Sequence, residues 1–200
     1  MYKVIALTGG LSNPSSSRVL ADDLAHQFEL AIASRGEQVE VEMVELRDHA
    51  HAIVDTMLTG FPTGDFARLM ERVVQADAML VVTPTFSAGI SGLVKSFFDV
   101  VEKDALTSMP VLMAATGGTE RHSLVIEYAM RPLFAYLGAR PAATGVYAAT
   151  SDFGGEGAAA LRRRVERAAE DLAQEVAGSG RRARGDDFVD FETLLARKSA

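Results

Sequence analysis

Residues 9–18 read GGLSNPSSSR and separate a short apolar run, Val4 to Leu7, from a stretch of helical spacing that Gly36 ends. Residues 83–99, TPTFSAGISGLVKSFFD, repeat this order, since they follow the apolar run Ala78 to Val82 and open a second amphipathic pattern. The carboxyl ends of parallel strands lie at one edge of a sheet, where ligands bind in open α/β folds. We therefore expect both loops to lie at one ligand-binding edge.

Strand-like and helical patterns alternate along the rest of the chain. Apolar or alternating runs predict five strands, at residues 4–7, 39–43, 78–83, 111–115 and 142–149. Helical spacing predicts five helices, at residues 19–32, 66–76, 93–101, 123–137 and 158–176. The stretch from Arg47 to Gly64 is less regular and is assigned no element. The alternation predicts an α/β protein with a doubly wound, five-stranded parallel sheet. In the flavodoxin-like order 2-1-3-4-5, the switch point lies between strands one and three, which end in the two loops.

The length and composition are those of one globular domain, with 200 residues, 48% of them hydrophobic and 24% charged. We assign residues 1–177 to this domain and residues 178–200 to a flexible linker with a short amphipathic tail. The linker is rich in Gly and Arg, and the tail carries a short apolar stripe of Phe188, Phe191, Leu194 and Leu195. Two interpretations stay open for the stripe: a segment that docks on a second copy or on a partner protein, and a disordered end.

Charge and residue usage argue against several functional classes. The formal net charge of −7 argues against nucleic acid as the main partner. No apolar run reaches the roughly 20 residues of a membrane span, and Met1 leads directly into a strand, so we expect neither a membrane segment nor a targeting segment. The absence of Cys excludes disulfides, a thiol nucleophile and a cysteine zinc site, and it fits a cytoplasmic protein.

The first loop has the chemistry of a phosphate site. Ser12, Ser15, Ser16 and Ser17 offer hydroxyls where the amide groups of a first helical turn lack partners. Arg18 can add a charge-assisted contact. The alternative is a capped helix start with a solvated serine-rich loop.

The second loop carries no cluster of acids, bases or thiols, which suits a flat ring held by main-chain groups. Pro84 fixes the exit of the strand, and Thr85, Phe86 and Ser87 can border a ring. Gly89 keeps side-chain atoms out of the way.

The third loop follows the fourth predicted strand and reads 115-ATGGTERH-122. Thr116, Gly117 and Gly118 again offer small side chains and free amides. His122 stands near the start of the next helix, as a cofactor contact, a catalytic acid or a structural hydrogen bonder. A phosphate site and a ring site at one switch point describe a mononucleotide such as FMN.

Two weaker motifs are set aside. Gly155, Gly157 and Ala160 have the spacing of a dinucleotide fingerprint, but no strand is predicted after the helix that follows. His49 and His51 form a pair without a third ligand, so we assign no metal site.

The loops together resemble the NADPH-dependent FMN reductase family, flavodoxin-like enzymes that supply reduced flavin to two-component monooxygenases. The resemblance covers about residues 2–176 and is carried by 9-GGLSNPSSSR-18, 83-TPTFSAGISGLVKSFFD-99 and 115-ATGGTERHSLVIEYAMRPLFAYLGA-139. Within the family, the chain is most similar to the actinobacterial branch that partners luciferase-like monooxygenases. Many members carry a serine soon after the first glycine and an arginine nearby, where this chain reads Gly10, Leu11 and Ser12.

This resemblance implies that Ser12 and Ser15 to Ser17 bind the FMN phosphate, and that Pro84 to Ser87 and Thr116 to Gly118 contact the ring. It also implies hydride transfer from NADPH to FMN. The flavin carries this chemistry, so no catalytic side chain is assigned. A homodimer or a dimer of dimers is implied, with the site near the subunit interface, and residues 47–62 are a candidate interface segment.

Three other functions stay open. The protein could hold FMN tightly and reduce quinones, azo dyes or metal oxyanions. It could instead be a flavodoxin-type electron carrier that does not oxidise NAD(P)H, although such carriers usually flank the flavin with larger aromatic residues and this chain has no Trp. A flavin-free scaffold is the third possibility.

Overall fold

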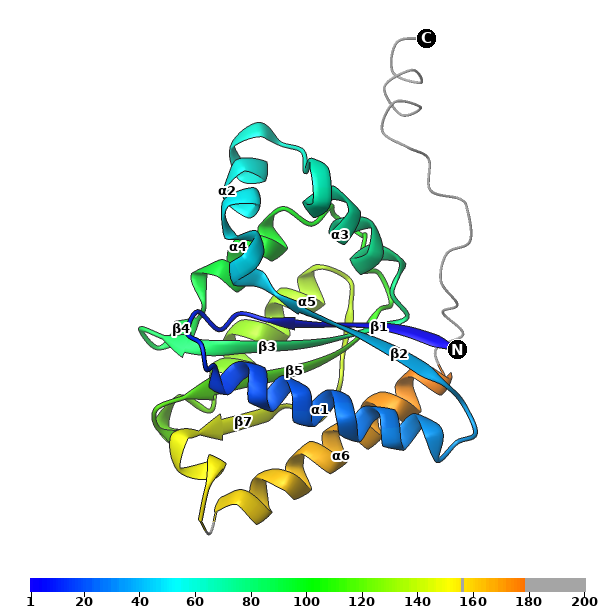
Figure 1. The fold of residues 1–200 in the computed structure, drawn as a ribbon, viewed down its shortest axis with the longest axis vertical. Helices are drawn as coiled ribbons and strands as arrows, with labels where there is room; N and C mark the ends of the chain where they lie inside the picture. The colour runs from blue at the N-terminus through cyan, green and yellow to red at the C-terminus, as the bar shows by residue number, and fades with distance from the viewer. Residues whose placement is uncertain (156, 179–200) are drawn as a thin grey trace.

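A parallel sheet with helices on both faces forms the centre of the computed structural model, which describes residues 1–155 and 157–178 (Figure 1). The strands of this parallel sheet are β1 (Tyr2–Thr8), β2 (Val39–Glu45), β3 (Ala78–Phe86), β5 (Pro110–Gly117), β6 (Arg140–Pro141) and β7 (Val146–Ala149). They follow the order β2-β1-β3-β5-β6, and β7 also pairs with β5. The predicted flavodoxin-like order 2-1-3-4-5 is confirmed.

The described residues form seven strands where five were predicted, for two reasons. The two-residue strand β4 (Gly89–Ile90) folds back antiparallel on the end of β3. The fifth predicted strand is also broken into β6 and β7. Between them, the guanidinium of Arg131 donates hydrogen bonds to the carbonyl oxygens of Ala142 and Ala143, at 3.0 and 3.3 Å. These carbonyl groups are therefore bound by a side chain where the chain leaves the sheet.

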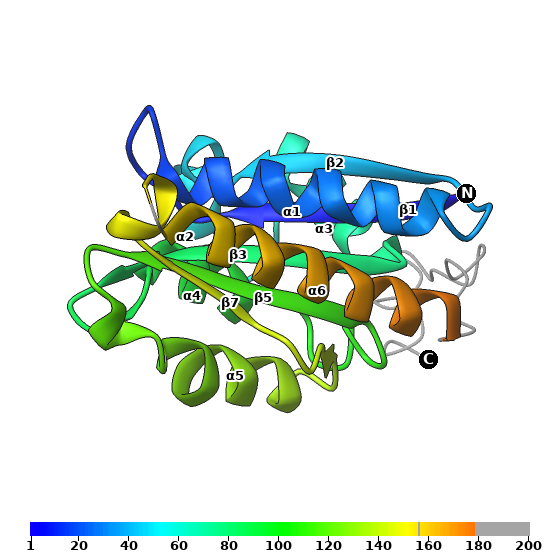
Figure 2. The ribbon, with the colours of Figure 1, turned by 90° about the horizontal axis from the view of Figure 1, so that it is seen from below.

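One face of the sheet is covered by α1 (Ser16–Ala33) and α6 (Gly157–Gly178), which run side by side in both views (Figure 1, Figure 2). Val4 and Ala6 of β1 point to this face and are buried against Leu20 and Leu24. The alternating side-chain directions of a strand send Ile5 to the opposite face. The amphipathic pattern of residues 19–32 therefore identifies α1 correctly, and no strand follows α6 among the described residues.

The other face packs under α2 (Ala50–Thr59), α3 (Gly64–Gln75), α4 (Gly92–Asp99) and α5 (Arg131–Tyr136). A chain of aromatic rings runs through this layer. Phe97 meets Phe66 and Phe98 edge to face, with ring centroids 6.2 and 5.2 Å apart, and Phe134 meets Phe98 at 4.9 Å. Such pairs stabilise a core beyond the area that they bury.

The stretch from Arg47 to Gly64 is more regular than the sequence indicates. A 3₁₀ turn, η1 (Leu46–His49), leads directly into α2. Ile53 of α2 faces the core, whereas Met57 and Leu58 are exposed, the latter by 81%. Apolar side chains on both sides of the helix conceal its periodicity.

The predicted helix over residues 123–137 is formed in two adjoining pieces, a π-helical turn, η3 (Ile126–Met130), and α5. A separate 3₁₀ turn, η2 (Glu120–His122), precedes them. The linker and tail predicted beyond residue 178 lie outside the described residues. No helix in the described part of the chain combines the length and the apolar character that a membrane span requires.

Candidate functional site

A cleft of about 310 Å³ lies at the carboxyl ends of β1, β3 and β5. Ten of the residues that the sequence nominates line it: Ser12, Ser15, Ser16, Ser17, Pro84, Thr85, Phe86, Thr116, Gly117 and Gly118. The three loops therefore meet at one place, as the strand order requires. Within the described residues, no charged side chain lines the cleft.

Four nominated residues are placed elsewhere. Arg18, Ser87, Gly89 and His122 are not among the lining residues. Ser87 belongs to the tight turn between β3 and β4, Gly89 begins β4, and half-buried His122 ends the 3₁₀ turn η2.

Four lining residues were missed by the sequence reasoning: Gly10, Leu11, Thr150 and Phe153. Gly10 and Leu11 belong to the first loop, of which only the serines and Arg18 were nominated, for their hydroxyls and charge. Thr150 and Phe153 belong to η4 (Thr150–Phe153), which follows β7. Because β7 is a parallel strand, its carboxyl end also reaches the ligand edge, and this was the signal available in the sequence.

The first loop ends in a well-formed helix start. Ser15 is the N-cap of α1, and its Oγ accepts a hydrogen bond from the Arg18 amide at 3.3 Å. The first turn of α1 carries no acidic side chain, so nothing of the helix itself competes with an anion for its free amide groups. This end of the cleft therefore has the donors that a phosphate needs.

A buried hydrogen bond connects the first loop to the third. The hydroxyls of Ser17 and Thr116 lie 2.8 Å apart, and both residues are buried. Although 99 positions separate them in the sequence, they lie together because β1 and β5 flank β3. The bond fixes the start of α1 against the end of β5.

The second loop is closed by its own residues. The Thr83 hydroxyl accepts a hydrogen bond from the Ser91 amide at 2.9 Å and donates one to the Pro84 carbonyl at 2.9 Å. Beyond it, Ser87 and Ala88 form a two-residue turn with φ of 49° and 65°. Phe86, 47% exposed, borders the cleft just before this turn.

Tyr147 supports the third loop from below. Its hydroxyl donates a hydrogen bond to the Thr119 carbonyl at 2.7 Å, and burial raises the pKa of this phenol, so it stays a donor at neutral pH. A Cβ at position 117 would lie 2.1 Å from the Tyr147 oxygen, which is why a glycine is required there. The glycine at position 117 leaves main-chain groups facing the cleft.

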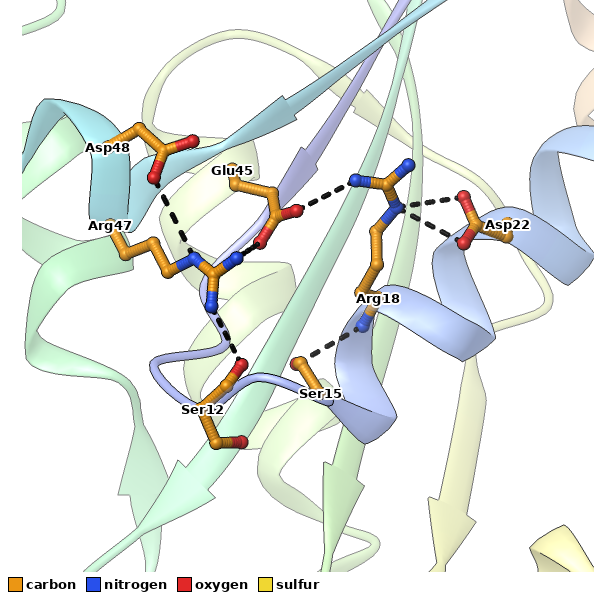
Figure 3. Close-up of polar contacts among 7 residues, drawn as sticks. All are labelled: Ser12, Ser15, Arg18, Asp22, Glu45, Arg47 and Asp48. Carbon is orange, nitrogen blue, oxygen red and sulfur yellow. Dashed lines mark hydrogen bonds and ion pairs between the residues drawn. The ribbon is translucent and has the colours of Figure 1, made fainter.

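The charged groups near the cleft are paired with one another (Figure 3). Arg18 turns outward: its Nε donates to Asp22 at 2.9 Å, and a terminal nitrogen donates to Glu45 at 2.8 Å. The hydrogen bond to Asp22 raises the pKa of the Arg18 guanidinium above its ordinary value. Glu45 also binds Arg47 at 2.8 Å. Arg18 thus belongs to an ion-pair network beside the first loop.

No group of three or more His, Cys, Asp or Glu side chains that could hold a metal ion occurs in the described residues. The His49 ring lies against Phe66, with centroids 5.9 Å apart. This ring contact gives His49 a place in the packing between η1 and α3.

The strand order, the switch-point cleft and the free helix N-terminus define the class: a nucleotide-binding protein of flavodoxin-like fold. A family model described as NADPH-dependent FMN reductase matches residues 2–154. The chain belongs to this family. It is an oxidoreductase, and the cofactors of the family are FMN and a nicotinamide nucleotide.

Individual relatives agree with this assignment. The FMN reductase (NADPH) of Pseudomonas aeruginosa is 36% identical over 154 residues, which are 76% of this chain and 79% of that protein. The NADH-dependent FMN reductase SfnE of Pseudomonas putida is 33% identical over 169 residues, 84% of this chain and 88% of that one.

Solved structures show the same architecture. An oxidoreductase from Corynebacterium diphtheriae is similar with a TM-score of 0.86 and 40% identity, over 88% of this chain and 97% of that one. The apo form of the NADH:FMN oxidoreductase EMOB has a TM-score of 0.72 at 24% identity, over 84% of this chain and 89% of that one, and supports the fold alone.

Proposed function

We propose that the cleft binds FMN with its phosphate at the first loop and its ring between the second and third loops. In this proposal FMN is reduced by NAD(P)H and then leaves for a partner monooxygenase. The observation that carries it is the convergence of three loops on one cleft, with serine hydroxyls at one end, Pro84, Thr85, Phe86 and Gly117 at the other, and no charged side chain among the described lining residues. When bound, FMN supplies the redox chemistry by accepting a hydride.

In this proposal, different residues bind the phosphate and the ring of FMN. At the phosphate end, the amides of Ser16 and Ser17 lie in the first turn of α1 and point out of the helix toward the cleft. At the ring end, Pro84, Thr85 and Gly117 line the cleft, and none of them has an ionisable side chain. The protein's contribution is therefore to hold and orient the flavin, and no side-chain acid or base is needed.

The neutral lining supports FMN as an exchanging substrate. A lining Arg or Lys would add charge-assisted hydrogen bonds, which are roughly twice as strong as neutral ones. In this cleft, the polar groups that the described lining residues offer are main-chain amides and side-chain hydroxyls, without a charge. Moderate affinity of this kind suits an enzyme that hands its product to another protein. We propose a luciferase-like monooxygenase as that protein, in line with the actinobacterial branch of the family, and the cytoplasm, where NAD(P)H is available, as the location.

A homodimer, or a dimer of dimers, is part of the proposal. Val54, Met57, Leu58 and Phe61 lie at helical spacing along and just beyond α2, and each is at least half exposed. A surface with several large apolar side chains is typical of a contact between subunits. Light scattering of the purified protein should give a mass of two or four chains, and the mass of a single chain would contradict this part.

The enzymatic proposal is tested by measuring the oxidation of NADPH and NADH with FMN, FAD and riboflavin, under air and then anaerobically. We expect a protein that loses its flavin on purification and oxidises a nicotinamide nucleotide when FMN is added. A protein that stays yellow and turns over quinones would favour the quinone or azo reductase. Absence of oxidation with excess FMN would favour the electron carrier and contradict the proposal.

Delivery to a partner is tested separately, by adding a luciferase-like monooxygenase that depends on reduced FMN. Product should form when this protein, FMN and a nicotinamide nucleotide are all present. If the monooxygenase forms no product although FMN is being reduced, the partner is of another class.

A further inference from the structure

Glu45, at the carboxyl end of β2, joins two arginines from different elements. One of its carboxylate oxygens accepts from Arg18 of α1 at 2.8 Å, and the other lies 2.8 Å from Arg47 of η1. Glu45 is opposite Thr8 in the register of β1 and β2, so the network lies directly beside the exit of β1 into the first loop. Its side chain is only 16% exposed, which favours a fixed geometry over the loose pairing of a surface carboxylate.

Arg47 connects this network to the first loop. Its terminal nitrogen donates a hydrogen bond to the Ser12 carbonyl at 2.9 Å. Leu11 to Pro14 are all exposed, and in the described residues no other hydrogen bond to this segment is formed. The conformation of the most exposed part of the first loop therefore depends on one guanidinium.

The direction of this contact suits an anion site. A carbonyl oxygen that faced the cleft would repel a phosphate. The Ser12 carbonyl oxygen instead accepts the hydrogen bond from Arg47. In Figure 3 the Ser12 carbonyl points at Arg47 and the Ser12 hydroxyl lies on the other side of the residue. Ser12 is at the same time a lining residue of the cleft.

We propose that Arg47, held by Glu45, is a positioning residue that fixes the first loop for the phosphate of the flavin. Arg47 does not line the cleft, so it acts through Ser12. Glu45 contributes to this positioning in two ways. It holds the guanidinium of Arg47 against the first loop, and it holds the guanidinium of Arg18 away from that loop. The inference rests on the proposed placement of FMN.

Flavin binding tests this, since FMN and riboflavin differ only by the phosphate. Fluorescence titration measures the dissociation constant of each flavin without any turnover. For Arg47→Ala we expect the constant for FMN to rise about tenfold and that for riboflavin to change less than about twofold, as for the loss of one hydrogen bond to a charged group. Arg47→Lys and Glu45→Gln should fall between Arg47→Ala and the wild type.

A matched control lies on the same strand. Glu42 of β2 forms a bidentate pair with Arg72 of α3, with both hydrogen bonds at 2.9 Å, away from the cleft. Arg72→Ala removes an arginine–glutamate pair of the same kind and should leave both flavin constants at their wild-type values.

The outcomes are distinct. Equal weakening of FMN and riboflavin by Arg47→Ala would show a general structural role and overturn the inference, as would unchanged FMN binding in Arg47→Ala. Should Arg47→Ala not fold, the same ratio measured for Arg47→Lys and Glu45→Gln decides. Wild-type protein that binds riboflavin as tightly as FMN would overturn the placement of the phosphate itself, and with it this role of Arg47.

Discussion

The first and second loops of the cleft are held in different ways. The loop after β1 is fixed from outside, by Thr116 of β5 through Ser17 and by Arg47 of η1 through Ser12. The loop after β3 is fixed from within, by the hydrogen bonds of Thr83 and by the pairing of Phe86 with Gly89. The loop that offers a phosphate site thus depends on distant residues, whereas the loop that borders the ring depends on its own main chain.

The two loops touch at Gly9, and this contact gives the largest predicted effect. A Cβ at position 9 would lie 2.2 Å from a methyl group of buried Val94 in α4. Gly9→Ala should therefore destabilise the protein by about 1–3 kcal/mol, as overpacking does, and should weaken binding of FMN and riboflavin alike. Urea unfolding and flavin titration measure the two effects.

Gly92→Ala is the control for this substitution, because a Cβ there would meet no atom within 4 Å. It should be neutral or slightly stabilising at the start of α4. If Gly9→Ala is equally harmless, the two loops are not coupled through this contact.

The next effect concerns the outside anchor of the first loop. Ser17→Ala leaves the hydroxyl of Thr116 buried without its partner, which should cost about 1–2 kcal/mol. Replacing Thr116 by Val in the same protein should restore part of the stability, because both polar partners are then gone. Ser16→Ala, at the exposed neighbouring position, is the control in urea unfolding. A double variant less stable than Ser17→Ala would argue against the hydrogen bond as the cause.

In the second loop, one substitution should raise the free energy of unfolding, whereas those in the first loop lower it. Ala88 has a φ of 65°, a conformation that costs an L-residue about 1–2 kcal/mol and glycine nothing, while glycine loses about 0.5–1 kcal/mol of chain entropy. Ala88→Gly should therefore raise the free energy of unfolding by about 0.5 kcal/mol. Thermal unfolding measures the gain, and a loss of stability would mean that the turn is not strained.

The smallest effect depends on pH and concerns α1, the helix that carries the first loop. Arg35, just beyond the end of α1, binds Glu170 of α6, and this hydrogen bond lowers the pKa of the Glu170 carboxyl. The ionised carboxylate thus favours the folded state above the unfolded pKa of about 4.3, and this contribution is lost as the pH falls through the lower folded value.

Glu170→Gln should cost about 0.5 kcal/mol or less at neutral pH, because Glu170 is 47% exposed and solvent screens the pair. The difference from the wild type should shrink as the pH falls below the unfolded pKa of about 4.3. Urea unfolding at neutral pH and in a series of increasingly acidic buffers measures it. Glu166→Gln, one turn earlier on α6 and without an ion pair among the described residues, should show no such dependence.

Much of the fold could be predicted from the sequence because its signals are local. The apolar run Val4 to Leu7 and the helical spacing after it are visible within 30 residues, and the strand order follows from the alternation of elements. The exceptions have two different physical causes. The fifth strand is interrupted where Arg131, on another element, binds its main chain. The periodicity of α2 is concealed by exposed apolar residues of the helix itself, such as Leu58.

The residues of the site likewise fall into those that local signals could predict and those that depend on distant parts of the chain. Ser15, Thr85 and Gly117 could be nominated because topology alone brings the ends of parallel strands together. The direction of Arg18 and the contact of Arg47 with Ser12 could not, because Glu45 and Arg47 lie about 30 residues beyond the loop that they organise.

The neutral lining also affects how ligands arrive. FMN and NADPH are both anions, and a chain with a formal net charge of −7 repels them at long range. A cleft that no described Lys or Arg side chain lines cannot offset that repulsion with an attractive field of its own, and amide dipoles act only at short distance. Added salt screens the repulsion. The second-order rate constant for FMN reduction should therefore increase with ionic strength, the reverse of what an enzyme that steers its substrate by opposite charge would show.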